Sequence, residues 1–270
     1  MSKNRFVFLI IIFVLIPAGV YLPKDPFSEK EAIFVIEKGD GSKEIALNLQ
    51  KEGFIRWSPI FRVYVLVAGS SKNLQAGSYL LSPSMDAPEI AGKFKKGDIA
   101  KFTVTIPEGF TQKQIEEKLN LKLPGDNLEG YLFPDTYQFP VGVGSEEVEK
   151  TMKDNFFKKT GGLKITEDIV IMASLIEKEV RIKEDKELVS GILWKRLRIG
   201  MPLQVDAEKW TYQNRGLPEN PIASPGLESI KAAIYPKDSQ YWYYLSTSEG
   251  LTIFSRTLEE HNIARAKYLK

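Results

Sequence analysis

The residues that this chain lacks narrow its chemistry before any pattern is considered. It has no cysteine and a single histidine, His261, among its 270 residues. Without cysteine there are no disulfides, no thiolate metal sites and no cysteine nucleophile. One imidazole also argues against a histidine-based zinc site, which normally takes two or three. We therefore expect no metal ion and no organic cofactor, and any catalysis must use carboxylates, hydroxyls, lysines or amides.

An excess of charge of one sign is also missing. The chain carries 37 basic and 35 acidic residues, a formal net charge of +2. This balance leaves no basic footprint for nucleic acid, so we expect no nucleic acid among the partners. With 43% hydrophobic and 11% aromatic residues, the composition is that of a globular protein with one large or two modest domains.

Long uncharged runs are scarce, and the one that stands out covers residues 6–22. At about 1.5 Å of rise per residue, it is just long enough to cross the hydrocarbon core as a helix. Lys3 and Arg5 precede it, so we expect the start in the cytoplasm and the rest on the extracytoplasmic side. The sequence predicts a single-pass anchor in the cell inner (cytoplasmic) membrane within residues 1–22, and a linker over residues 23–31.

Two alternatives compete with an uncleaved anchor. A signal peptide also has a basic start and an apolar stretch, but that stretch is usually shorter and an A-x-A-like cleavage site follows it. Here Tyr21, Leu22 and Pro23 occupy that position instead. A buried helix of a soluble domain is the other alternative, which the position at the extreme N-terminus disfavours.

Residues 32–122 contain three short copies of one pattern, and each copy predicts a strand, a turn and a short helix. The matching segments start at Ile36, Leu81 and Ile106. Alternating or β-branched runs indicate the strands, and apolar residues four positions apart indicate the helices. Two interpretations stay open: a small α+β domain with internal similarity, or a LysM-like region, a compact module found in cell-wall proteins.

Residues 123–270 favour a larger α+β domain. Leu128–Tyr137 is rich in aromatic residues, glycine and proline, which predicts a turn-rich loop. Thr166 is a suitable N-cap for an apolar helix that we expect to be buried. The patterns predict helices over residues 146–159, 166–180, 185–199 and 258–269.

Two carboxylates, Glu177 and Glu179, lie near the end of this apolar helix. A carboxylate among apolar side chains loses hydration, which disfavours its charged form and suits it to donate a proton near neutrality. The alternative is a structural role, with neutralisation by Arg181, Lys195 or Arg196. The helical periodicity does not choose between the two glutamates, because both flank the apolar stripe.

Several segments, taken in order, resemble one family. After the N-terminal run, they are Ile106–Thr111, Leu128–Tyr137, Ala173–Glu179, Arg196–Gln204 with Asp206, Pro221–Gly226, Ile230–Ala233 with Pro236, Phe254 with Ser255, and Glu260–Asn262. Together they resemble the endolytic murein transglycosylases, the YceG-like family, over nearly the whole chain. The chain departs from the family pattern after Gln204, where Asp206-Ala-Glu replaces a common Asp-Pro-Thr.

The resemblance implies a membrane-anchored enzyme that cuts peptidoglycan glycan strands internally and leaves 1,6-anhydro-N-acetylmuramic acid ends. It implies a LysM-like region at 32–122 and a catalytic domain at 123–270. It also assigns the general acid/base to Glu177, the first glutamate of the E-K-E run, and for this reason Glu177 is preferred over Glu179. Glycan strands, the membrane and cell-wall synthesis proteins are the expected partners.

Candidate substrate-binding residues come from the two loops of the resemblance. The aromatic loop supplies Glu129, Tyr131 and Tyr137, and the loop after the Gly-Met-Pro turn supplies Gln204 and Asp206. Tyrosine rings stack on sugar faces, and carboxylates or amides hydrogen-bond hydroxyl or acetamido groups. The alternative for all five is a structural role within their loops.

Two other functions compete with a transglycosylase. One is a non-catalytic, membrane-anchored protein that binds peptidoglycan. The other is a hydrolytic muramidase that pairs Glu177 with Asp135 or Asp206, since ordinary glycosidases use two carboxylates. The nature of the product ends separates the two enzymes.

Overall fold

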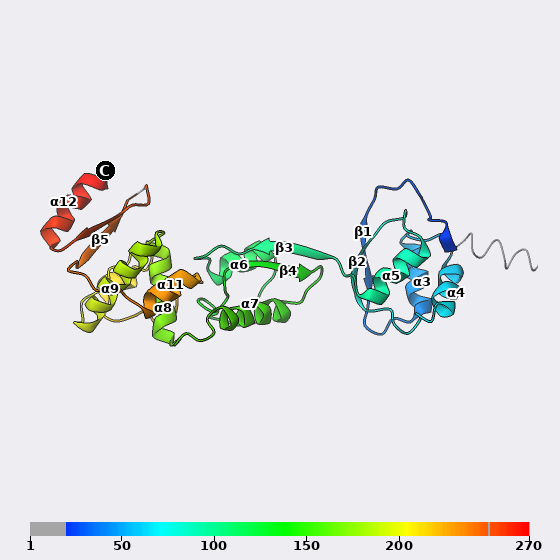
Figure 1. Ribbon diagram of the computed structural model, residues 1–270, viewed down its shortest axis with the longest axis horizontal. Helices are drawn as coiled ribbons and strands as arrows, with labels where there is room; N and C mark the ends of the chain where they lie inside the picture. Colours follow the sequence, from blue (N-terminus) through cyan, green and yellow to red (C-terminus); the bar gives the residue numbers. More distant parts are fainter. Residues whose placement is uncertain (1–19, 248, 270) are drawn as a thin grey trace, which may run out of the picture. The chain divides into compact units, whose positions relative to one another are not determined.

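The computed structural model describes residues 20–247 and 249–269 of the chain, which folds with mixed α+β structure (Figure 1). The chain divides into two compact units. The first comprises the residues up to Phe102 together with Gln138–Val143, and the second comprises Thr103–Tyr137 and Gly144 onward. Each unit has its own hydrophobic core.

The first unit is built around an antiparallel pair of strands. Strand β1 (Ala32–Ile36) pairs with β2 (Gly77–Leu81), so that Phe34 lies opposite Tyr79. Between them the chain forms helices α3 (Ser42–Lys51) and α4 (Ser58–Val67), and α5 (Ala87–Lys96) follows β2. The order is therefore β-α-α-β with one further helix. The buried side chains of all five elements meet in one core, which includes Phe34, Leu49, Phe61, Tyr79 and Phe94.

Local sequence explains the repeated strand-and-helix pattern, which the structure confirms in each of the three copies. The copies fold as β1–α3, β2–α5 and β3 (Lys101–Thr105) with α6 (Gln112–Leu119). Asp86 and Thr111 begin α5 and α6 with capping boxes, in which the side chain three residues later bonds back to the cap. The third copy differs in its packing, because α6 belongs to the second unit.

Strand β3 pairs with β4 (Thr136–Pro140). The aromatic segment at 128–137 is mostly irregular, as predicted, but its last two residues belong to β4. Both strands cross the boundary between the two units, which falls after residues 102 and 137. The division into functional regions at residue 122 stays a prediction.

The second unit is mainly helical. The four helices predicted from periodicity are confirmed, each within three residues at its ends, as α7 (Ser145–Lys159), α8 (Glu167–Glu179), α9 (Lys183–Arg198) and α12 (Leu258–Tyr268). The sequence patterns did not predict the short α10 (Trp210–Gln213), helix α11 (Leu227–Ile234) or the hairpin of β5 (Tyr243–Ser246) with β6 (Thr252–Ser255).

Helix α8 is the centre of this second core, as its apolar surface predicted. Its residues 170–176 are all buried, and α11 and α9 pack against it. The Thr166 hydroxyl accepts a hydrogen bond from the Ile169 amide at 3.4 Å, which is the predicted N-cap. The helix ends at Glu179, because Val180 adopts an extended conformation. Both candidate carboxylates therefore lie in its last turn.

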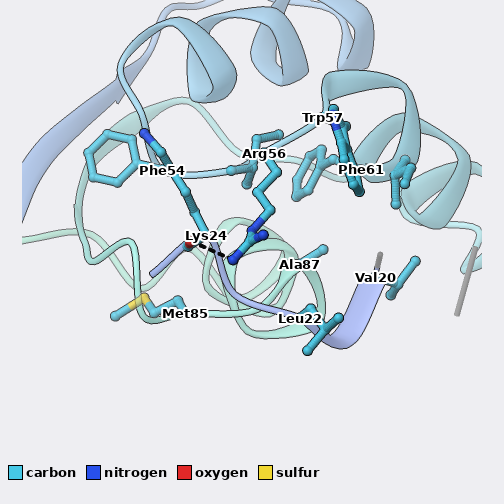
Figure 2. Close-up of a pocket in the computed structure, with 11 residues that line it drawn as sticks. Val20, Leu22, Lys24, Phe54, Arg56, Trp57, Phe61, Met85 and Ala87 are labelled. Atoms are coloured by element: carbon cyan, nitrogen blue, oxygen red, sulfur yellow. Dashed lines mark hydrogen bonds between the residues drawn. The ribbon is translucent and has the colours of Figure 1, made fainter. Parts of the chain in front are cut away.

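The predicted membrane anchor lies almost wholly outside the described residues. Within residues 20–247 and 249–269 no helix is long and apolar enough to span a bilayer. The following segment is held against the first unit, where the Arg56 guanidinium donates to the backbone oxygens of Pro23 at 3.3 Å and Lys24 at 2.9 Å. Figure 2 shows the bond from Arg56 to Lys24 beside a small pocket lined by Val20 and Phe61, whose volume of about 20 Å³ holds little more than one water molecule.

Candidate active site

Helix α8 presents its two terminal glutamates to different surroundings. Glu177 and Glu179 are two positions apart, and two residues turn a helix by about 200°. One side chain therefore faces α9 and α11, while the other faces the loop after Leu203 and Tyr244 of strand β5. The two sites differ in their partners, their charge and their access to open space.

The Glu177 carboxylate is enclosed by donors. The Lys186 ammonium lies 3.1 and 3.3 Å from its two oxygens. The Gly226 amide donates to Oε2 at 2.9 Å and the Ser229 hydroxyl donates to the same oxygen at 2.7 Å. The Glu177 and Lys186 side chains are only 8% and 5% exposed. We name these four residues the Glu177 cluster.

This environment differs from the apolar one expected for Glu177. The carboxylate meets a lysine, a backbone amide and a hydroxyl that all donate to it, and not a shell of apolar side chains. The geometry therefore describes a fixed, ion-paired carboxylate, which is the structural alternative, with Lys186 in place of the basic residues considered from the sequence.

A further carboxylate, Glu108, lies beside the Glu177 cluster. A side chain on Gly226 would overlap the Glu108 carboxylate, so glycine is required for this close approach. Burial raises the pKa of Glu108, and the charge of Glu177 raises it further, while Lys186 opposes the shift. The segment that carries Glu108 is held in place by the Gly109 backbone amide, which donates to the Ser224 backbone oxygen at 2.8 Å. The sequence placed this Ile-Pro-Glu-Gly segment in the repeat and in the resemblance, but did not predict Glu108 as a site residue.

Glu179 lines a cleft of about 220 Å³ in the second unit. We name this cavity the Glu179 cleft, and Glu177 is not among its described lining residues. The Ala207 amide donates to Glu179 Oε1 at 3.2 Å. Burial nevertheless raises the pKa of Glu179, and the neighbouring charge of Asp206 adds to the rise. Glu179 thus has the desolvated setting that the sequence predicted for one of the two glutamates.

Two predicted substrate-binding residues, Gln204 and Asp206, line the same cleft. The Gln204 backbone has a left-handed φ of 56°, and its backbone N–H donates to the Thr211 backbone oxygen at 3.1 Å. Asp206 accepts a hydrogen bond from the Tyr212 hydroxyl at 2.5 Å. The structure therefore brings Gln204 and Asp206 together with Glu179, and the loop that carries them is fixed by α10.

The opposite wall of the cleft comes from β5 and α12. Tyr244 is buried, and this burial together with the charge of Glu179 raises the pKa of its hydroxyl well above the ordinary value. The Tyr243 ring stacks on His261, with ring centres 5.4 Å apart, and lies under the Arg196 guanidinium. Burial and the nearby arginines lower the pKa of His261, so this wall presents a neutral imidazole at pH 7.

The three residues predicted from the aromatic loop do not line the Glu179 cleft in the described structure. The Glu129 carboxylate accepts from the Gln112 amide at 3.3 Å, at the start of α6. The Tyr131 ring packs edge-on against Phe156 at 5.3 Å. Both contacts are structural, which is the alternative stated for these residues.

Tyr137 has the most enclosed position of the three. It is 6% exposed, and its hydroxyl donates to the Phe133 oxygen at 2.5 Å and accepts from the Asn155 amide at 3.0 Å. Burial raises its pKa to about 12. These contacts give Tyr137 a structural role in its loop, which is the alternative stated for it, and its contact with substrate stays a prediction.

Sequence reasoning missed several lining residues of the cleft. Tyr212, Tyr243 and Arg265 belong to elements whose role depends on the fold of distant segments. The available signal was the aromatic run at 241–244, which by itself does not distinguish packing from binding. Only the pairing of β5 with β6 and the docking of α12 show that part of this run faces a cavity.

A model of the YceG-like family matches residues 34–209 and 210–267, which is most of the chain. The chain belongs to this family. The match confirms the resemblance stated from the ordered motifs. It spans segments of both compact units, including helix α8 with its two glutamates.

This YceG-like protein is similar to curated and solved relatives. It is 30% identical to a Bacillus subtilis protein named endolytic murein transglycosylase, over 87% of this chain and 84% of the relative. A Streptococcus pneumoniae protein of the same name is 26% identical over 96% of this chain and 64% of the relative. A crystal structure of a yceG-like protein from Listeria monocytogenes aligns with a TM-score of 0.53 and 27% identity, covering 88% of this chain and all of that one.

Proposed function

We propose that this chain is an endolytic lytic transglycosylase of peptidoglycan, and that Glu179 is its proton donor. The relatives of the same family carry the name endolytic murein transglycosylase. The observation that supports the choice of residue is the desolvated Glu179 carboxylate in the wall of a cleft of about 220 Å³. This assignment revises the preference for Glu177, which came from the resemblance and not from geometry.

The chemistry of a general acid explains why Glu179 suits the role better than Glu177. A proton donor must hold its proton near neutral pH and must reach a substrate atom. Burial and the charge of Asp206 raise the pKa of Glu179, and open space adjoins it. The Glu177 oxygens are already occupied by Lys186, Gly226 and Ser229.

The reaction needs only one carboxylate. Glu179 gives its proton to the oxygen that bridges N-acetylmuramic acid and N-acetylglucosamine, and the bond from that oxygen to the anomeric carbon breaks. The resulting carboxylate accepts the proton of the muramic 6-hydroxyl, whose oxygen bonds to the same anomeric carbon. The product carries a 1,6-anhydro end, Glu179 regains its proton, and no water is consumed.

The residues around the cleft would bind the sugar chain. Tyr212 and Tyr243 provide aromatic rings, and Gln204 provides an amide for hydroxyl or acetamido groups. The fixed Arg196 guanidinium, which donates to the Leu203 oxygen at 2.6 Å, holds the Gln204 loop against the cleft. These polar and aromatic groups match a hydroxyl-rich polymer.

A hydrolytic muramidase is the second candidate, because Asp206 lines the cleft with Glu179. Hydrolysis uses a second carboxylate as nucleophile or as the base that activates water. Asp135, the other partner considered from the sequence, is paired with Lys159 at 3.0 Å and is not among the described residues of the cleft. Hydrolysis would therefore depend on Asp206.

The location and the N-terminal region belong to the same proposal. A single-pass inner-membrane anchor at residues 1–22 would put both units on the extracytoplasmic side, where the substrate is. The β-α-α-β order of the first unit supports a LysM-like role in holding glycan strands. Cell-wall synthesis proteins would be partners because cut strands have to be coordinated with new ones.

The decisive experiment is digestion of purified sacculi by the full-length chain, with mass spectrometry of the released ends. We expect 1,6-anhydro ends from internal cuts and none from the Glu179→Gln variant. If the released fragments carry reducing ends, and these ends are absent from the Asp206→Asn digest, the enzyme is a hydrolytic muramidase. No release of glycan by the folded wild-type chain would contradict both enzymes and leave the peptidoglycan-binding alternative.

A further inference from the structure

We propose that the Glu177 cluster is a positioning device for the proton donor: Lys186 and Ser229 hold Glu177, which fixes the last turn of α8 and keeps Glu179 in its cleft. The inference rests on the proposed function, because it takes Glu179 as the acid. It assigns a role to a buried ion pair that the reaction itself does not use.

The first argument is that the cluster joins three elements at one carboxylate. Glu177 is on α8, Lys186 is on α9, and Gly226 and Ser229 are the N-cap and third residue of α11. Two of the bonds, at 2.9 and 2.7 Å, converge on the same oxygen from α11. Directional bonds from two neighbouring helices leave the Glu177 side chain one orientation.

The second argument is that the last turn of α8 is held on both sides. On the far side from the cluster, the Ser246 hydroxyl of β5 donates to the Glu179 backbone oxygen at 2.8 Å. Since the two glutamates lie about 200° apart around the helix, a rotation that frees Glu177 also turns Glu179 out of its place. The helix ends at Glu179, so no following turn restrains it.

The third argument is energetic. A buried ion pair adds little stability over a well-packed apolar pair, so its presence calls for a reason other than stability. Glu108 also interacts with Lys186, whereas Glu228 is paired with Lys183 at 2.9 Å. Lys186 is thus the ion-pair partner that holds the Glu177 carboxylate at this position.

The test uses two changes that keep the net charge of the cluster. The double variant Glu177→Gln/Lys186→Met removes one negative and one positive charge, and the glutamine oxygen can still accept from Gly226. Ser229→Ala removes one neutral donor and serves if the double variant fails to fold. Lys186→Arg keeps a buried cation and is the conservative comparison.

We expect kcat on sacculi to fall about tenfold to a hundredfold in both test variants, with KM unchanged and partial rescue by arginine. The high-pH limb of the rate profile should also move to lower pH, because a displaced Glu179 gains water and its pKa falls. A purely structural role would leave that limb in place. Folded variants with the wild-type kcat and limb would overturn the inference.

Failure of the proposed function gives a different result. If Glu179→Gln still cleaves glycan at the wild-type rate, Glu179 is not the donor, and both proposals fall. If Glu179→Gln is inactive while the cluster variants match the wild type, only the positioning role is overturned.

Discussion

Replacing each glutamate of the last α8 turn by glutamine separates the two candidate acids. Glutamine keeps the shape of the side chain and an oxygen that can accept the Ala207 bond at position 179, or the Gly226 and Ser229 bonds at position 177. It cannot donate a proton as an acid. Any difference between the two variants therefore reports which carboxyl group the reaction uses.

The expected magnitudes differ strongly. General acid catalysis contributes about 10²- to 10⁴-fold, which corresponds to about 3–5.5 kcal/mol of transition-state stabilisation. Glu179→Gln should lose at least this factor, and more because the same group also acts as the base. Glu177→Gln leaves the donor in place and should lose only about tenfold to a hundredfold through displacement of α8.

The stability of the variants provides a check that is independent of activity. Because burial raises the pKa of Glu179, the folded state holds its proton more tightly than the unfolded chain does. That contribution is complete below the ordinary carboxyl pKa and is lost as pH rises through the raised value. Glu179→Gln should therefore unfold at a urea concentration no lower than the wild type at neutral pH.

The assay is release of soluble glycan from purified sacculi by equal amounts of folded protein, with end groups identified by mass spectrometry. Glu147→Gln, an exposed change on α7, is the matched control for a single amide substitution. Near-complete loss in Glu177→Gln together with substantial activity in Glu179→Gln would refute the reasoning and return the catalytic role to Glu177.

Three further predictions follow from the charges near the site. Lys186→Met alone should destabilise the fold by about 3–5 kcal/mol in urea unfolding, because it leaves the buried Glu177 carboxylate without its ion-pair partner. The double variant Glu177→Gln/Lys186→Met should recover most of this loss, and equal stability of the single and double variants would contradict the prediction. Asp206→Asn should lower the pKa of Glu179 and shift the high-pH limb of the rate profile to lower pH, whereas an unmoved limb would show that the two carboxylates do not interact. Glu108→Gln should be more stable than the wild type at about pH 8 but not at about pH 4, because the raised pKa of Glu108 makes its ionisation costly only above the ordinary carboxyl range. Thermal melts at the two pH values test this, and a larger gain at the lower pH would oppose it.

Much of the local structure could be predicted from the sequence because its signals are local. Periodicity located α7, α8, α9 and α12, and Thr166 marked the start of α8. The apolar surface of α8 correctly predicted burial. Helix α11 and the β5–β6 hairpin were missed because their short patterns matter only in contact with α8, α9 and α12.

The sequence by itself identified two carboxylates at the end of a buried helix as candidates for the chemistry, and its ordered motifs indicated the family. Only the tertiary structure decided what surrounds each carboxylate. The hydrogen-bond partners of Glu177 are 9 to 52 positions away in the chain, and the Ala207 amide that donates to Glu179 is 28 positions away. A helical pattern fixes the direction of a side chain, but the charge and hydration that it meets depend on segments that only folding brings to it.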